Sequence, residues 1–382
     1  MKFIATAPIL AEGIVEDELL ELGAEKTSAK RGKIYFESSL RKACEIGFNL
    51  RSGKRILMPL SEFRYSSKES FYEVAKEIEW EKYIPPSMTF SVRIKGGDSV
   101  FKNTAYAALV LKDAIVDRIR DKKGARPSID KENPQISILG LVQNNRAELS
   151  LDLCGPIHKR GYRKFASPGA LNESLAAAIL RIAQYSGEET FLDPMAGSGT
   201  IGIEAALIAS KIVPGLLWRQ GRGFFSTDFI SEKEKREIVK EAKDKISIPK
   251  GKIILSDISA ENIKICSQNA RMAKIDKYIT FMVSDFFDLK LDYNEGVIVT
   301  NTPYGDHAEI EQEEKEFFKK IGDKLKKDFC GFKAYLLLGS TSAAKSVGLS
   351  ASKKISLYNG RKEVKLCAYE LYQGSLKRRE RE

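Results

Sequence analysis

Apolar and polar residues follow one kind of spacing up to about residue 155. Short runs with strand-like alternation are separated by stretches in which apolar side chains recur every three or four positions. This pattern predicts small α+β units, and Asn144-Asn145 between the last two runs predicts a hairpin. The expected strands cover residues 2–8, 33–38, 55–63, 88–97, 136–144 and 146–155, and the expected helices cover 15–22, 40–50, 70–80 and 108–124.

From about residue 170 the pattern changes to apolar strands that alternate with helices. Such an alternation predicts a parallel sheet with helices on both faces. In the last segment, 353–372, apolar residues alternate on either side of Asn359-Gly360, which is a strong hairpin signal, so we expect antiparallel strands at the sheet edge. The strands are expected within residues 190–197, 252–257, 279–285, 296–301 and 333–339, and the helices at 171–187, 201–210 and 261–273.

Length and composition narrow the class of protein. A chain of 382 residues, 43% hydrophobic, is long enough for two or three domains with packed cores. It has no apolar run of the roughly 18 residues that a membrane helix needs, and acidic residues follow the N-terminus too soon for a signal peptide. We therefore expect a cytoplasmic protein. Five cysteines without a CxxC pair, and only two histidines, argue against a zinc site or a disulfide framework.

The charge of the chain favours a polyanionic partner. Lysine and arginine number 63 against 52 aspartates and glutamates, which gives a net charge of +11. Residues 51–150 hold 18 basic against 13 acidic residues, and residues 351–382 hold 9 against 4. If a nucleic acid binds, the N-terminal half and the C-terminal end should supply much of the contact, although a generally basic surface would give the same count.

A glycine-rich turn follows the first strand of the second half. Residues 191–200 read FLDPMAGSGT, where Gly197 and Gly199 let the backbone approach a ligand and the next helix presents free N–H groups. The turn departs from G-x-G-x-x-G at Ala196, and no G-K-[ST] follows, which argues against a P-loop ATPase. The turn favours a nucleotide-like cofactor over a plain tight turn.

Two more acids end neighbouring strands. Asp257 follows the strand at 252–257, and Asp285 follows the strand at 279–285 and precedes Phe286. With Asp193 they place three carboxylates along one sheet edge, where open α/β sheets bind ligands. A helix cap or a solvated loop acid explains each of them equally well when it is taken alone.

Residues 299–305, VTNTPYG, end the strand at 296–301 and resemble the N-P-P-Y motif of methyltransferases that act on exocyclic amines. Such an amine is a poor nucleophile because its lone pair is delocalised into the ring. The amide oxygen of Asn301 and the backbone carbonyl of Thr302 can accept its two N–H donors, and Tyr304 can stack on the base. An ordinary turn has the same residue types, but the order of the upstream turn and acids favours catalysis.

Taken together, these motifs resemble the THUMP-containing RNA guanine-N2 methyltransferases, and they are similar to the N-terminal enzyme of the bacterial large-subunit ribosomal RNA methyltransferases. The resemblance covers nearly the whole chain, with HKRGYR at 158–163 as the clearest string at the domain junction. It implies a Rossmann-like class I methyltransferase domain with a C-terminal antiparallel hairpin, preceded by an α+β ferredoxin-like and THUMP RNA-binding region. The implied domains are 1–55, 56–155 and 156–382.

The resemblance also implies roles for single residues. Asp193 and the glycine turn would hold the methionine part of S-adenosylmethionine, Asp257 the ribose hydroxyls and Asp285 the adenine amine. Thr302 departs from the family's usual proline, which leaves loop rigidity and base preference open. The implied catalytic residues are Asn301, Thr302, Pro303 and Tyr304. The implied cofactor residues are Asp193, Pro194, Ala196, Gly197, Ser198, Gly199, Asp257, Asp285, Phe286 and Asn301, and the RNA contacts are Arg160, Tyr162, Arg163, Arg219 and Arg222.

The function that the resemblance implies is methyl transfer to the N2 amine of a guanosine in 23S ribosomal RNA, without a metal. Some members carry a second methyltransferase domain, and because this chain stops at residue 382 we expect a single activity. Three alternatives stay open: a transfer RNA guanine-N2 methyltransferase, an adenine-N6 nucleic-acid methyltransferase, and a nonenzymatic RNA-binding ribosome-assembly factor.

Overall fold

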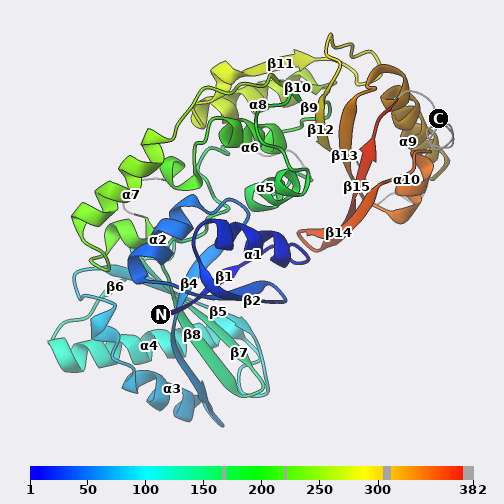
Figure 1. Ribbon diagram of the computed structural model, residues 1–382. Coiled ribbons are helices and arrows are strands. Elements are labelled where there is room, and N and C mark those ends of the chain that lie inside the picture. The colour runs from blue at the N-terminus through cyan, green and yellow to red at the C-terminus, as the bar shows by residue number, and fades with distance from the viewer. Residues whose placement is uncertain (166–168, 219–221, 304–310, 373–382) are drawn as a thin grey trace.

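The computed structural model describes residues 1–165, 169–218, 222–303 and 311–372. Within them the chain forms an eight-stranded sheet in the N-terminal half and a seven-stranded sheet in the C-terminal half (Figure 1). Helices pack on both sheets, and each sheet has its own apolar core. No helix in these ranges is long and apolar enough to cross a bilayer.

The two N-terminal units share one continuous sheet, which the sequence pattern does not reveal. The strand β4 (Arg55–Arg64) pairs with β1 at its start and with β8 along most of its length, so it belongs to both units. The domain boundary proposed between residues 55 and 56 falls at the start of this strand, and the boundaries stay predictions. The strand order is β2-β3-β1-β4-β8-β7-β5-β6, with β1 Lys2–Thr6, β2 Glu25–Lys30, β3 Lys33–Glu37, β5 Thr89–Gly96, β6 Ser128–Ile129, β7 Ile136–Gln143 and β8 Arg146–Asp152.

One face of this sheet is covered by helices whose apolar sides interleave with it. Phe3, Ile34 and Ile56 from the strands share a core with Phe48 and Leu111 from the helices. The helices are α1 Glu12–Glu21, α2 Leu40–Asn49, α3 Lys68–Glu77 and α4 Thr104–Lys123, with the 3-10 turn η1 Trp80–Lys82 after α3.

The second sheet has the predicted α/β architecture. Its order is β11-β10-β9-β12-β13-β15-β14, and the first five strands are parallel. The helices α5, α6 and α8 pack on one face, and α9 and α10 pack on the other, which confirms the double cover. The strands are β9 Phe191–Asp193, β10 Ile253–Asp257, β11 Ile279–Val283, β12 Gly296–Asn301, β13 Phe332–Leu338, β14 Lys353–Asn359 and β15 Lys362–Glu370, and the helices are α5 Glu173–Ile182, α6 Thr200–Ala209, α8 Ala260–Met272, α9 Glu311–Asp328 and α10 Thr341–Ser346.

Both predicted hairpins are present. Asn144 and Asn145, with φ angles of 52° and 56°, form the turn between β7 and β8. The antiparallel hairpin of β14 and β15 lies at the sheet edge, as expected. Asn359 pairs with Lys362, so the two turn residues are Gly360, with a φ of 65°, and its successor. The turn is therefore displaced by one residue from Asn359-Gly360, and Asn359 ends the strand.

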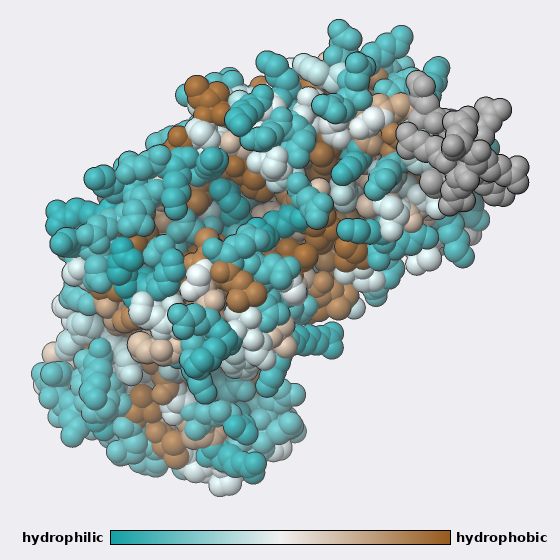
Figure 2. All heavy atoms as spheres, in the orientation of Figure 1, coloured by the Kyte–Doolittle hydropathy of each residue, from teal (hydrophilic) through white to brown (hydrophobic). Residues whose placement is uncertain are grey.

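The segment between α6 and β10 ties the two halves together. It contains η2 Pro214–Leu217, η3 Gly223–Ser226 and α7 Glu232–Asp244. Phe224 from this segment is buried in the N-terminal core, and the ring of Phe48 on α2 lies 5.6 Å from that of Trp218. Figure 1 shows α7 beside α2, and Figure 2 shows mostly hydrophilic side chains along this part of the surface. This long segment before Asp257 therefore packs against the N-terminal region.

Candidate active site

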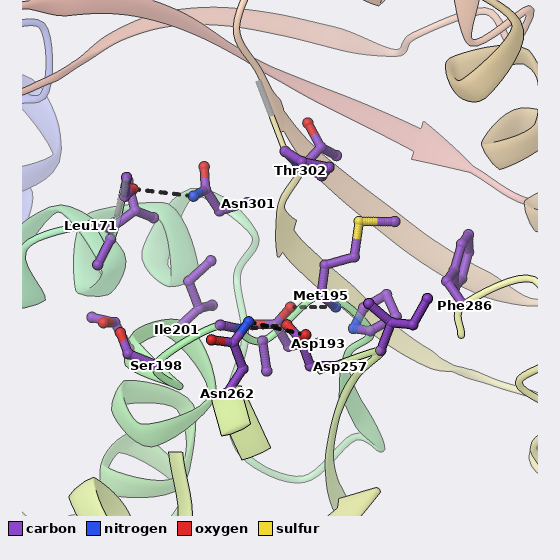
Figure 3. A pocket seen from close by; sticks show the side chains of 18 of the residues that line it. Leu171, Asp193, Met195, Ser198, Ile201, Asp257, Asn262, Phe286, Asn301 and Thr302 are labelled. Atoms are coloured by element: carbon purple, nitrogen blue, oxygen red, sulfur yellow. Dashed lines mark hydrogen bonds between the residues drawn. The ribbon is translucent and has the colours of Figure 1, made fainter. Parts of the chain in front are cut away.

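A cavity of about 880 Å³ opens at the carboxyl ends of β9, β10 and β12 (Figure 3). From β9 the chain builds β10 and β11 on one side, and β12 on the other, so the strand order reverses at this point. Open α/β sheets bind their ligands at such a reversal. The volume suits a ligand of cofactor size, since small-molecule sites span roughly 300–1,000 Å³.

The glycine-rich turn forms one wall of the cavity. Pro194, Ala196, Gly197 and Ser198 line it, and Gly197 and Gly199 have φ angles of 53° and 83°, which glycine adopts readily. Among these predicted cofactor residues, Gly199 alone does not line the cavity. A Cβ at Gly199 would lie 2.2 Å from the sulfur of the cysteine at position 266 on α8, so this glycine allows close packing between α6 and α8.

Asp193 ends β9 at the floor of the cavity and is 1% exposed. Its Oδ1 accepts hydrogen bonds from Thr300 Oγ1 at 2.7 Å and from the Met195 amide at 3.3 Å. Burial raises the pKa of Asp193 to about 7 although these hydrogen bonds favour the ionised form, and the carboxylate of Asp257 adds to the rise. A cationic ligand group beside Asp193 would favour the ionised carboxylate and so lower this pKa again. The carboxylate and the cationic group would then stabilise each other.

Asp257, at the end of β10, links the second strand to the turn. Its Oδ2 accepts from the Gly197 amide at 2.9 Å, and its Oδ1 accepts from the Ser259 amide at 2.9 Å and from Asn262 Nδ2 at 3.1 Å. A carboxylate has about four acceptor positions, so Oδ2 keeps one for a ligand hydroxyl. The predicted role toward a ribose is compatible with this geometry.

Asp285 and Phe286 line the far wall, as the cofactor assignment requires. Asp285 Oδ1 accepts from the Phe287 amide at 2.9 Å, which fixes the side chain at the start of the loop after β11. Phe286 is 5% exposed and stacks on Phe329 at 5.8 Å. Ile258, which is 71% exposed, forms an apolar rim next to Asp257.

Asn301 ends β12 at the mouth of the cavity, and its amide is oriented by the backbone. Its Nδ2 donates to the carbonyl oxygen of Gly169 at 3.4 Å, and Figure 3 shows the nitrogen turned toward the 169–171 segment. Its Oδ1 is buried and has no hydrogen-bond partner among the residues that the structure describes. A buried acceptor without a partner costs free energy, of the order of 1–3 kcal/mol, and thus marks a place where a ligand donor fits.

Thr302 replaces the expected proline and is held firmly. It is 1% exposed, and both its amide and its Oγ1 donate to the carbonyl oxygen of Leu337 in β13, at 3.2 and 2.8 Å. A proline has no N–H and could make neither bond. The threonine therefore fixes the start of the loop by hydrogen bonds. Pro303 also lines the cavity, whereas the predicted catalytic Tyr304 lies outside the described residues.

Several cavity residues were not predicted from the sequence. Most are apolar, or come from elements that carry no motif, so only the fold brings them to the site. Asn262 on α8 lines the cavity as well, and no motif assigns it a role. The remaining lining residues that no prediction included are Gly169, Ala170, Leu171, Met195, Thr200, Ile201, Ile258, Phe287, Glu313, Glu314 and Phe317.

The prediction that Arg160 and Tyr162 contact RNA is wrong, because their side chains are buried. They are 0% and 1% exposed. Arg160 Nε and Nη2 donate to the Glu204 carboxylate at 3.2 and 3.3 Å, Nη1 donates to the Ile157 carbonyl at 2.7 Å and Nη2 to the Arg51 carbonyl at 2.5 Å. The Tyr162 hydroxyl donates to Glu204 at 3.0 Å. The basic string at the junction thus connects the N-terminal region to α6.

The other three proposed RNA contacts have different outcomes. Arg163 donates to Thr200 Oγ1 at 2.9 Å and to the Leu171 carbonyl, and so it ties the junction to the cavity wall. Arg222 donates to three backbone carbonyls of residues 154–159 and lies 4.8 Å above the ring of Trp218. Both side chains therefore have structural contacts, and RNA contact by either stays a prediction. Arg219 lies outside the described residues.

Comparisons with protein families match all three regions of the chain. Residues 160–367 match the family described as RMKL-like, methyltransferase domain. Residues 65–152 match the THUMP domain, and residues 2–57 match the RlmL ferredoxin-like domain. The predicted order of ferredoxin-like, THUMP and methyltransferase regions is confirmed.

Relatives over nearly the full chain include curated proteins and solved structures. The chain is 34% identical to the ribosomal RNA large subunit methyltransferase K/L of Shewanella frigidimarina, covering 98% of this chain and 54% of that protein. It thus spans about half the length of the curated relatives it matches. The crystal structure of SMU.472, a putative methyltransferase complexed with SAH, superposes with a TM-score of 0.87 at 24% identity, over 98% of this chain and 99% of that chain. The crystal structure of a predicted N6-adenine-specific DNA methylase from Listeria monocytogenes superposes with a TM-score of 0.83 at 28% sequence identity. The match covers 97% of this chain and 96% of that chain.

Proposed function

The chain belongs to the family of RMKL-like methyltransferase domains, and on this basis we propose that it transfers a methyl group from S-adenosylmethionine to the exocyclic N2 amine of a guanosine in 23S ribosomal RNA. The name of its Shewanella frigidimarina relative supports the large-subunit ribosomal RNA as substrate. The resemblance stated from residues 158–163 and the motifs after them is confirmed by the family match.

The residues of the cavity fit S-adenosylmethionine. The buried carboxyl of Asp193 suits the cationic methionine end, the open acceptor position on Asp257 Oδ2 suits a ribose hydroxyl, and Phe286 and Ile258 offer apolar surface to the adenine. When bound, the cofactor supplies an activated methyl group on a sulfonium. The SAH bound in the related crystal structure supports this choice of cofactor.

One observation carries the proposed reaction: the buried Asn301 Oδ1 has no hydrogen-bond partner within residues 1–165, 169–218, 222–303 and 311–372. We assign to it one N–H of the target amine, and we assign the second N–H to the backbone carbonyl of Thr302. When both N–H groups donate hydrogen bonds to these oxygens, delocalisation of the nitrogen lone pair into the ring is opposed. The nitrogen then becomes pyramidal, and its lone pair can attack the methyl group. The wall between Asn301 and Asp193 would hold the two reactants in line, and such positioning can supply about 7–11 kcal/mol in favourable cases.

The RNA partner follows from the N-terminal region. A THUMP domain match at residues 65–152 and the basic excess in residues 51–150 support binding of structured RNA through phosphates and shape. We propose that this region holds the RNA while a distant base enters the cavity. A cytoplasmic location is the corresponding prediction.

The test is the nucleoside composition of ribosomal and transfer RNA from cells that lack the gene, measured by mass spectrometry. We expect N2-methylguanosine to disappear from a site in large-subunit ribosomal RNA and to return with the wild-type gene but not with Asn301→Ala. A loss confined to transfer RNA would move the substrate there. A loss of N6-methyladenosine would identify adenine as the target base. No loss in either RNA would favour a nonenzymatic RNA-binding factor.

A further inference from the structure

We propose that Asn359, at the end of β14, is a positioning residue that orients the Asn301 amide through the carbonyl of Gly169. The inference rests on the proposed function in so far as Asn301 Oδ1 receives the target amine. It gives the C-terminal hairpin, which contributes no lining residue to the cavity, a part in the reaction.

The carbonyl oxygen of Gly169 lies between two asparagines that are distant in sequence. Asn359 Nδ2 donates to it at 3.2 Å and Asn301 Nδ2 donates to it at 3.4 Å. A carbonyl oxygen has two lone pairs, so these two amides can occupy both. The hairpin, the 169–171 wall of the cavity and the end of β12 therefore meet at one atom.

This contact decides which end of the Asn301 amide is presented to the substrate. An amide has a donor end and an acceptor end of nearly equal shape. With Nδ2 on Gly169, Oδ1 occupies the buried position, where no described residue is its hydrogen-bond partner. Rotating the amide by about 180° would set oxygen against the Gly169 carbonyl and turn an NH₂ group toward the N–H donors of the target amine, where it repels them. The Gly169 carbonyl thus selects the productive orientation.

Asn359 does not form the hairpin turn, although the Asn-Gly pair in the sequence suggests that it does. The hairpin turn is formed by Gly360 and the next residue, and Asn359 lies in the β14 ladder opposite Lys362. The hairpin itself is anchored, because Leu357 and Val364 are buried in the core beside α5 and α6. Its last strand residue can therefore hold the peptide at Gly169, whose φ of 73° places it in a conformation that tolerates few other residues.

The first test is kinetic and uses the full chain with labelled S-adenosylmethionine and deproteinised large-subunit RNA that lacks the modification. Asn359→Ala should lower the single-turnover rate constant at saturating RNA and cofactor by roughly 10- to 100-fold, since a misplacement of about 1 Å can cost 10²-fold. The equilibrium affinities for both ligands should stay within about twofold, since Asn359 is absent from the cavity wall. Asn359→Asp, of equal volume, should be slower still because it sets a carboxylate against a carbonyl. Ser356→Ala, on the same strand but on its other face, is the matched control.

A coupling test separates positioning from general damage. If Asn359 acts through Asn301, then Asn301→Ala/Asn359→Ala should be no slower than Asn301→Ala alone, because the group to be oriented is already absent. Rate effects that multiply in the double variant would overturn the inference.

A spectroscopic test needs no turnover. In protein labelled with ¹⁵N only at asparagine, the side-chain amide signals of Asn301 are identified by their loss in Asn301→Ala. Asn359→Ala should shift or broaden them and Ser356→Ala should leave them in place. Unchanged signals in Asn359→Ala would overturn the inference. If the wild type methylates no RNA, the proposed function fails, and this measurement alone decides whether Asn359 orients Asn301.

Discussion

Two buried polar clusters lie on either side of α6, and they differ in how completely their groups are paired. At the junction, Arg160, Glu204 and Tyr162 satisfy one another and two backbone carbonyls. At the cavity, Asn301 Oδ1 has no hydrogen-bond partner in the described part of the chain, and Asp193 has a raised pKa. Buried polar groups are usually paired, so Arg160, Glu204 and Tyr162 serve structure, whereas the acceptor of Asn301 keeps capacity for a ligand. Arg51 Nη1 beside the junction is also buried without a partner among the described residues, so the contrast holds for these named groups.

The comparison also separates residue type from role. Arginine and tyrosine in a basic string are typical of RNA contacts, whereas here they are buried and both donate hydrogen bonds to one glutamate. The Arg160 contacts reach from the Arg51 carbonyl in the N-terminal region to α6, whose first turn lines the cavity. The junction therefore fixes the orientation of the N-terminal region relative to the reaction site.

The largest effect is expected when one side of the junction pair is removed. Arg160→Met leaves the Glu204 carboxylate buried without its cation, and breaking such a pair costs about 3–5 kcal/mol. The free energy of unfolding from urea titration measures the loss. Arg181→Met, which breaks the more exposed pair with Glu21, is the control and should cost at most about 1 kcal/mol. Equal losses of unfolding free energy in the two variants would contradict a special structural role of the buried Arg160–Glu204 pair.

At the cavity the largest effect should be on rate rather than on stability. Asn301→Ala removes an acceptor aimed at charge that develops in the transition state, and such groups contribute about 10²–10³ in rate, or 2.7–4 kcal/mol. Single-turnover methylation at saturating ligands gives the rate constant, and urea titration should show little change in the free energy of unfolding. Asn294→Ala, an exposed asparagine before the same strand, should leave both unchanged. A stability loss as large as that of Arg160→Met would argue for a structural Asn301.

A smaller effect is expected from pH. Below its pKa of about 7 the Asp193 carboxyl holds a proton, which must leave before it can pair with the cationic end of the cofactor. Cofactor affinity should therefore fall about tenfold from pH 8 to pH 6, equal to roughly 1.4 kcal/mol. Calorimetry in buffers of different ionisation enthalpy would show proton release on binding near pH 7. The Asp193→Asn variant should bind the cofactor weakly, with an affinity that is nearly independent of pH from 6 to 8. If that variant kept the wild-type pH dependence of cofactor affinity, Asp193 would be excluded as the titrating group.

The smallest effect is expected at Thr302. Thr302→Val keeps the shape and the amide bond to Leu337 but removes the hydroxyl bond, so stability should fall by about 1 kcal/mol. Thermal unfolding of the two proteins measures the difference. A gain in stability would show that the hydroxyl contributes nothing to the loop.

Much of the fold was predictable from local pattern. Asn144 and Asn145 marked their hairpin, and the strand and helix alternation after residue 170 gave the parallel sheet. The edge strand β2 was missed because its residues are polar on both faces, and α7 and α9 were not predicted. The continuous eight-stranded sheet depends on pairing between β4 and β8, which are far apart in sequence, so no local pattern reveals it.

The site was predictable where a motif ends a strand. Asp193, Asp257, Asp285 and Asn301 all line the cavity because carboxyl ends of parallel strands meet at one edge. Burial was not predictable for Arg160, since charged residues are seldom buried unless paired, and its partner Glu204 is 44 residues away. The orientation of the Asn301 amide depends on Gly169, which no motif contains.

The most direct test of the central claim is the mass of the product. Purified protein is incubated with S-adenosylmethionine that carries a deuterated methyl group and with separated ribosomal and transfer RNAs lacking the modification, and the nucleosides are analysed by mass spectrometry. We predict deuterated N2-methylguanosine in large-subunit ribosomal RNA with the wild type, and a yield reduced by about 10²–10³ at short times with Asn301→Ala. Label in N6-methyladenosine, or equal label with Asn301→Ala, would contradict the account.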